Sequence, residues 1–165
     1  DREVLFDFER VKGHDLVLVS ALYSAPPDVV WDQILEVEDY AEVVDEILWA
    51  RIDSRTPEGD HEIVEGSLEL ALPSGVPGEM TVRAYYEPAR GYLPYHLVSG
   101  KKNPFRHLVG YWSVTPYPGD RTLVLFMADA QLSVPVPVKY RYALARSASA
   151  YLVAALRDQA SASAR

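Results

Sequence analysis

Residues 48–134 alternate between apolar and polar side chains over most of their length, and no other feature of the sequence restricts the fold as strongly. In the stretch 80–87, Met80, Val82 and Ala84 share one phase, and Arg83 lies on the other. A period of two indicates β-strands that bury one face, and clean alternation is typical of antiparallel sheets. We predict strands at 48–53, 61–72, 80–87, 91–99, 107–115 and 121–134, joined by turns that contain Gly and Pro.

Different patterns flank this region. Residues 16–23 are apolar enough for a strand that is covered on both sides. Pro27 and Asp28 suit the first turn of a helix, and a second short helix is expected within 38–47. The segment 135–159 is apolar around much of a helical circumference, so we predict a long C-terminal helix that is gripped on more than one side.

These elements predict one α+β domain over residues 1–165, with 161–165 as a frayed tail. In this helix-grip arrangement, a curved antiparallel sheet of six to seven strands wraps around the long C-terminal helix, and two short helices follow the first strand. A chain of 165 residues with 48% hydrophobic residues can bury a sizeable core. A sheet that curls around one helix often leaves a gap between them, and such gaps hold small apolar ligands.

Composition excludes several classes of function. The chain has no cysteine, which excludes disulfides and thiol catalysis. Its net charge is −8, with 21 acidic and 6 basic residues in 1–87 but 3 acidic and 10 basic residues in 88–165. We therefore expect no nucleic-acid partner, and we expect the two halves to neutralise each other across the fold. The start at Asp1 indicates a processed or trimmed chain, so a soluble cytoplasmic protein and one exported to the periplasm after loss of an N-terminal segment both stay open, as does the oligomeric state.

Three stretches carry a resemblance to a known superfamily. The first is SALYSAPPDVVWDQILEVEDYAEVVDEILWARI, residues 20–52; the second is FRHLVGYWSVTPYPGDRTLVLFMADAQL, residues 105–132; the third is the long helix after VPVPV. In order and spacing they resemble the SRPBCC, or START/Bet v 1-like, superfamily, and within it the polyketide cyclase and coenzyme Q-binding group. The resemblance implies a deep cavity between the sheet and the C-terminal helix, and binding or transfer of a lipid, sterol, quinone or polyketide.

The predicted cavity residues lie on apolar strand phases or on one stripe of the closing helix. They are Leu68, Leu70, Met80, Val82, Ala84, Tyr86, Leu108, Trp112, Leu125, Met127, Asp129, Tyr142, Ser149 and Leu152. In 121–134 the choice of phase stays open, because Val124, Phe126 and Ala128 form an equally apolar alternative to the phase of Asp129. Ser149 either leaves room for a ligand or donates a hydrogen bond to its own helix.

Few residues suggest catalysis or metal binding. His14, His61, His96 and His107 show no metal-ligand spacing, and we expect no metal and no cofactor. The leading hypothesis is a non-catalytic carrier of a hydrophobic small molecule. One alternative is an aromatase/cyclase-like enzyme, in which Asp129 or a cavity tyrosine moves protons. Another is an interaction module with a filled core.

The turn GKKNPFRH, residues 100–107, is basic and carries an aromatic side chain. Lys101, Lys102, Phe105 and Arg106 are candidates for a transient contact with an anionic membrane. The alternative is a solvated turn in which Phe105 folds back onto the protein.

Overall fold

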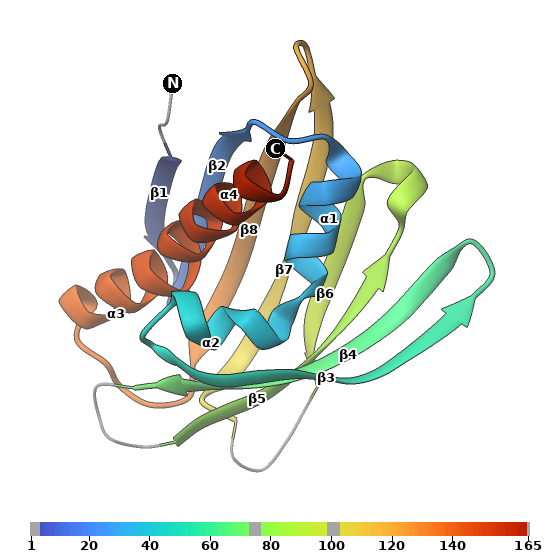
Figure 1. Cartoon of the computed structure of the whole chain (residues 1–165). Coiled ribbons are helices and arrows are strands. Elements are labelled where there is room, and N and C mark those ends of the chain that lie inside the picture. The colour runs from blue at the N-terminus through green and yellow to red at the C-terminus, as the bar shows by residue number, and fades with distance from the viewer. Residues whose placement is uncertain (1–3, 73–76, 99–102, 165) are drawn as a thin grey trace.

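The computed structural model describes residues 4–72, 77–98 and 103–164, and it consists of one antiparallel sheet with a layer of helices over one face (Figure 1). The strands are β1 (Val4–Val11), β2 (His14–Tyr23), β3 (Ile47–Glu58), β4 (His61–Ala71), β5 (Pro77–Tyr86), β6 (Tyr92–Val98), β7 (Phe105–Tyr117) and β8 (Arg121–Leu132). The helices are α1 (Pro27–Leu35), η1 (Val37–Asp39), α2 (Tyr40–Val43), η2 (Pro88–Arg90), α3 (Val138–Ala145), η3 (Arg146–Tyr151) and α4 (Leu152–Ser163).

The sheet has the strand order β1-β2-β8-β7-β6-β5-β4-β3. Strands β3 to β8 pair with their neighbours in sequence, and β2 joins the sheet beside β8. The connection that contains α1 and α2 therefore leads from one side of the sheet to its far edge, along the same face as the C-terminal helix (Figure 1). This path encloses the space between the sheet and the helices.

The predicted α+β fold with a long C-terminal helix is confirmed, with eight strands where the sequence indicated six or seven. The additional strand is β1, which forms a hairpin with β2 through Lys12 and Gly13. Both residues have positive φ angles, 51° and 89°, which suit the twist of a tight hairpin. The sequence did not predict β1 because an edge strand buries little of its surface and needs no clear apolar pattern; Leu5 in this strand is 57% exposed.

The helices after β2 begin where the sequence places them. Pro27 opens α1, Asp28 lies in its first turn, and Val30, Trp31 and Ile34 are buried against the core. The second predicted helix is short and irregular, with η1 leading directly into α2. The side chain of Tyr40 at the start of α2 is buried.

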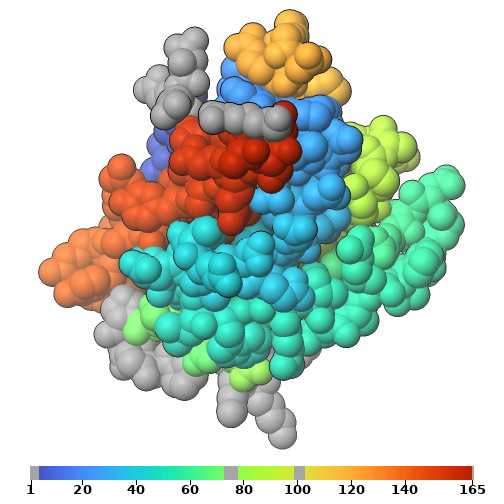
Figure 2. All heavy atoms as spheres, in the orientation of Figure 1, coloured from blue at the N-terminus to red at the C-terminus, as the bar shows by residue number. Residues whose placement is uncertain are grey.

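The C-terminal helix runs from Val138 to Ser163, with the π-helical turn η3 between its two α-helical parts. It extends into the segment expected to fray. In α4, Leu152, Val153 and Leu156 are buried, and α4 packs against β2 and α1. Figure 2 shows α4 directly beside α1 on this face of the molecule. The predicted grip on more than one side therefore holds for α4, whereas α3 is largely exposed.

Candidate ligand-binding cavity

A cavity of about 230 Å³ lies between the inner face of the sheet and the helices. Side chains from every strand except β1 line it, together with residues from α1, α2 and the C-terminal helix. Most of these side chains are apolar. An engineered apolar cavity of about 150 Å³ stays dry and binds benzene, so this space can hold a larger apolar group.

Nine of the fourteen predicted residues border the cavity. They are Leu68, Leu70, Met80, Val82, Ala84, Leu108, Trp112, Ser149 and Leu152. The strand residues among them come from β4, β5 and β7, where alternation separates one apolar phase from one more polar phase. The ring of Trp112 packs against Phe126 with 4.8 Å between the centroids, so two aromatic rings form one part of the wall.

Leu125, Met127 and Asp129 lie outside this lining, which is formed on β8 by Phe126, Ala128, Ala130 and Leu132. The sheet register explains which of the two phases of β8 faces the cavity, because directly opposed residues on neighbouring strands point to the same face. Trp112 pairs with Phe126, and Leu108 pairs with Ala130.

Two predicted aromatic residues also lie elsewhere. Tyr86 shares the phase of Ala84 but lies beyond the cavity, where its ring packs edge-on to Trp31 at 5.1 Å. Tyr142 is 42% exposed and packs edge-on against Phe6 and Phe8 of β1, with centroids 5.5 and 5.6 Å away. The ring of Tyr142 therefore packs against β1, the strand that the sequence did not predict.

Phe105, the aromatic residue among the candidate membrane contacts, points into the protein. Phe105 lines the cavity, and a register irregularity between Phe105 and His107 accompanies this inward orientation. Arg106 is exposed, and Lys101 and Lys102 lie outside the described residues. The arrangement agrees with the alternative in which Phe105 folds back. Within the described ranges, no helix combines the length and hydropathy needed to cross a membrane.

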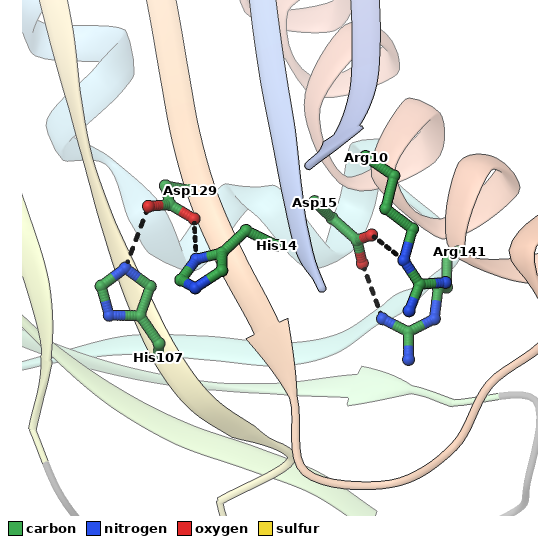
Figure 3. A network of polar contacts seen from close by, with 6 residues as sticks. All are labelled: Arg10, His14, Asp15, His107, Asp129 and Arg141. Carbon is green, nitrogen blue, oxygen red and sulfur yellow. Dashed lines mark hydrogen bonds and ion pairs between the residues drawn. The ribbon is translucent and has the colours of Figure 1, made fainter. Parts of the chain in front are cut away.

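One end of the cavity is charged, which the sequence did not reveal. Asp15 and Arg141 border the cavity and are 5% and 7% exposed, and Arg141 Nη1 donates to Asp15 Oδ2 at 2.9 Å. Arg141 Nε also donates to the carbonyl oxygen of Val136 at 2.7 Å. The Nε atom of Arg10 lies 3.9 Å from Asp15 Oδ1 (Figure 3). Among the described residues, this Oδ1 atom is buried without a hydrogen-bond partner.

Three other polar groups of the wall, the hydroxyls of Tyr40, Tyr95 and Ser149, donate hydrogen bonds within the protein. Tyr40 donates to the carbonyl oxygen of Ile34 at 2.5 Å, and Tyr95 donates to that of Met127 at 3.2 Å. Burial raises the pKa of both tyrosines, so both hydroxyls stay protonated at neutral pH. Ser149 donates to the carbonyl oxygen of Ala145 in its own helix. The wall can therefore bind an apolar body, with the buried Asp15–Arg141 ion pair beside it.

Comparisons with known proteins agree with this geometry. Residues 23–157 match the model of the family described as polyketide cyclase / dehydrase and lipid transport. No curated protein matches the sequence significantly.

Three solved structures show how widely the fold is shared. The Zhui aromatase/cyclase from Streptomyces sp. R1128 has a TM-score of 0.73 at 18% identity, over 92% of this chain and 96% of that one. A START superfamily protein from Mycobacterium smegmatis has a TM-score of 0.69 at 23% identity, over 90% and 97%. The STAR-related lipid transfer protein from Xanthomonas axonopodis has a TM-score of 0.65 at 13% identity, over 94% and 98%. These likenesses establish the fold, and they include both an aromatase/cyclase and a lipid transfer protein.

Proposed function

We propose that this chain, which belongs to the polyketide cyclase / dehydrase and lipid transport family, binds and carries a hydrophobic small molecule in the cavity between its sheet and its C-terminal helix. The observation that carries the proposal is the cavity itself, about 230 Å³ of space bordered mainly by apolar side chains. Transfer of apolar surface from water contributes about 25 cal/mol per Å², so burial of the ligand supplies most of its affinity.

The charged end of the cavity restricts which polar groups a ligand can place there. A buried carboxylate oxygen without a donor costs free energy, and a ligand hydroxyl would remove that cost by donating to Asp15 Oδ1. We therefore propose an amphipathic ligand with a long or polycyclic apolar body and one hydroxyl group that can donate to Asp15. A sterol and a lipid with a free hydroxyl have this form, whereas a quinone offers only acceptor carbonyl oxygens and suits this end of the cavity less well.

An aromatase/cyclase-like enzyme is the second candidate. The likeness to the Zhui aromatase/cyclase supports the fold that such an enzyme needs, and Asp15 is a carboxylate at the cavity wall. The acid first considered, Asp129, lies outside the lining, and the hydroxyls of Tyr40 and Tyr95 already donate to carbonyl oxygens. The wall offers few groups for moving protons, which favours a carrier. An interaction module with a filled core fits the cavity less well than either.

Native mass spectrometry of the freshly purified chain tests the carrier. We expect a bound mass in stoichiometric amount, released by organic solvent and identified as a lipid, isoprenoid or quinone. An empty chain that also fails to bind a panel of sterols, fatty acids and quinones would overturn the proposal. Incubation of the chain with the released compound separates the candidates, because a carrier returns it unchanged and a cyclase returns a product of altered structure.

A matched pair of variants tests the location of the ligand. Ala148 borders the cavity, whereas Ala143 faces solvent on the same helix. We expect Ala148→Leu to fill part of the cavity and lower the bound fraction at least tenfold, and Ala143→Leu to leave it unchanged. Equal binding by the two variants would move the ligand out of this cavity.

A further inference from the structure

Two histidines and an aspartate meet on three neighbouring strands of the sheet, away from the cavity. His14 begins β2, Asp129 lies on β8, and His107 lies on β7 (Figure 3). The Nδ1 atom of His14 is 2.8 Å from Asp129 Oδ1, and the Nε2 atom of His107 is 3.1 Å from Asp129 Oδ2. The two imidazole rings are 5.2 Å apart, centroid to centroid.

The register places this cluster on the face of the sheet opposite the cavity. Successive side chains of a strand point to opposite faces, and Asp15, Leu108 and Ala130 all border the cavity. Their neighbours in sequence, His14, His107 and Asp129, therefore point outward. The cluster remains accessible from solvent, since the side chains of these residues are 34%, 36% and 26% exposed.

The three side chains form the donor set of a transition-metal site. One ligand atom from each residue lies within 4.8 Å of the other two. Two imidazole nitrogens and one carboxylate oxygen suit Zn²⁺ and its neighbours in the first transition row, whereas Ca²⁺ and Mg²⁺ prefer oxygen ligands throughout. Three protein ligands also leave a fourth position of a tetrahedral zinc ion to water, which the exposed side of the cluster can supply.

We propose that His14, His107 and Asp129 bind one divalent transition-metal ion, with Zn²⁺ as the representative, on the outer face of the sheet. Binding requires the three ligand atoms to turn from each other toward a shared ion at about 2.0–2.2 Å, a change within reach of the side chains alone. The ion cross-links β2, β7 and β8. The proposal reverses the expectation of no metal, which rested on the sequence spacing of the histidines; the fold brings together His14 and Asp129, which are 115 positions apart.

Isothermal titration of the untagged, chelator-treated chain with ZnCl₂ tests the site. We expect saturable binding of one ion per chain. Loss of a residue that only supports a metal ligand weakens metal binding by about 10- to 100-fold. Each of the variants His14→Ala, His107→Ala and Asp129→Asn removes a ligand itself and should weaken Zn²⁺ binding by at least this factor. Co²⁺ added in place of Zn²⁺ should give the visible absorption of a nitrogen- and oxygen-bound ion, and the variants should lose that absorption.

The control is His96→Ala, because His96 stacks on Tyr85 at 5.8 Å and takes no part in the cluster. This variant should bind Zn²⁺ as the unchanged chain does. Circular dichroism of every variant establishes that its fold is intact before binding is compared. No saturable binding by the unchanged chain would overturn the proposal, and so would binding that survives in His14→Ala and His107→Ala.

Discussion

The two α-helical parts of the C-terminal helix share one axis but have opposite environments. In α4, Val153 and Leu156 are fully buried. In α3, Val138 and Tyr140 are 54% and 43% exposed, and Arg141 is the buried residue. The cavity lies beneath α3 and η3, with Leu152 as the only α4 residue among its described lining.

This difference divides the helix into an anchor, which is α4, and a wall of the cavity, which is α3 together with η3. Large apolar side chains fill the space beneath α4, whereas the residues of α3 and η3 that border the cavity include the small Ala145, Ala148 and Ser149 beside Leu144 and Arg141. The π-helical turn lies between the two parts, and such turns recur at functional sites. We infer that α4 stabilises the fold and that α3 and η3 shape the space for the ligand, with the Asp15–Arg141 ion pair attaching α3 to the sheet.

Arg141→Met gives the sharpest test of this attachment. It removes the nearer partner of the buried Asp15 carboxylate, which then keeps only Arg10 at 3.9 Å, and removal of one partner from a buried ion pair costs up to about 3–5 kcal/mol of unfolding free energy. Chemical denaturation monitored by circular dichroism measures the loss. The double variant Asp15→Leu/Arg141→Leu should recover most of it, because apolar pairs often replace buried ion pairs without loss of stability. A loss below 1 kcal/mol for Arg141→Met would show that α3 is held by other contacts.

Two leucine truncations compare the anchor with the wall. Leu156→Ala removes a fully buried side chain of α4, and such truncations cost about 2–5 kcal/mol of unfolding free energy. Leu144→Ala should cost distinctly less, because Leu144 is partly exposed and already borders a cavity. Denaturation of both variants in the same buffer gives the comparison. Equal losses would contradict the division of the helix.

The sheet was predictable from sequence because alternation is local. The strands β3 to β8 each show their own period of two, and the register of β7 then fixes which phase of β8 faces inward. Alternation within β8 alone could not decide this, because Leu125 and Met127 are as apolar as Val124 and Phe126. The missing information was the pairing of Trp112 with Phe126.

The polar sites were hidden because they depend on contacts between distant residues. Asp15 and Arg141 are 126 positions apart, and no pattern in the sequence links them. His107 and Asp129 are 22 positions apart on neighbouring strands, a spacing that matches no metal motif. Periodicity therefore placed nine residues at the cavity wall, and the fold had to supply the rest of the lining, including its charged end.

Alkaline pH provides a test that acts on the buried tyrosines. Tyr23 donates to the carbonyl oxygen of Val153 in α4 at 2.7 Å, and Tyr40 donates to that of Ile34 in α1. Burial raises the pKa of both tyrosines above the usual value of about 10, so folding favours their protonated forms. The contribution of these two tyrosines to the free energy of unfolding is complete below pH 10. Above pH 10 it falls by about 1.4 kcal/mol per pH unit for each tyrosine.

Denaturation midpoints measured between pH 9 and pH 11.5, with tyrosinate absorption recorded in parallel, check this expectation. Tyr23→Phe should make the decline in stability less steep, because one of the buried tyrosines with a raised pKa no longer titrates; Tyr40 and Tyr95 continue to do so. Ionisation of every tyrosine at about pH 10 without loss of stability would show that the two hydroxyls are not held as the structure places them.

Replacement of Ser149 tests where the wall of the cavity ends, and it is expected to change the free energy of unfolding least. Its buried hydroxyl borders the cavity but donates to the carbonyl oxygen of Ala145, as a serine in a helix can do without any ligand. Ser149→Ala removes a hydrogen bond of this kind, which contributes about 0.5–1.5 kcal/mol, and we expect a loss at the lower end because the carbonyl keeps its helical surroundings. Ligand affinity should change less than threefold. A tenfold loss of affinity with unchanged stability would instead make this hydroxyl a ligand contact, and the π-helical turn that carries it would then belong to the binding site rather than only to the wall.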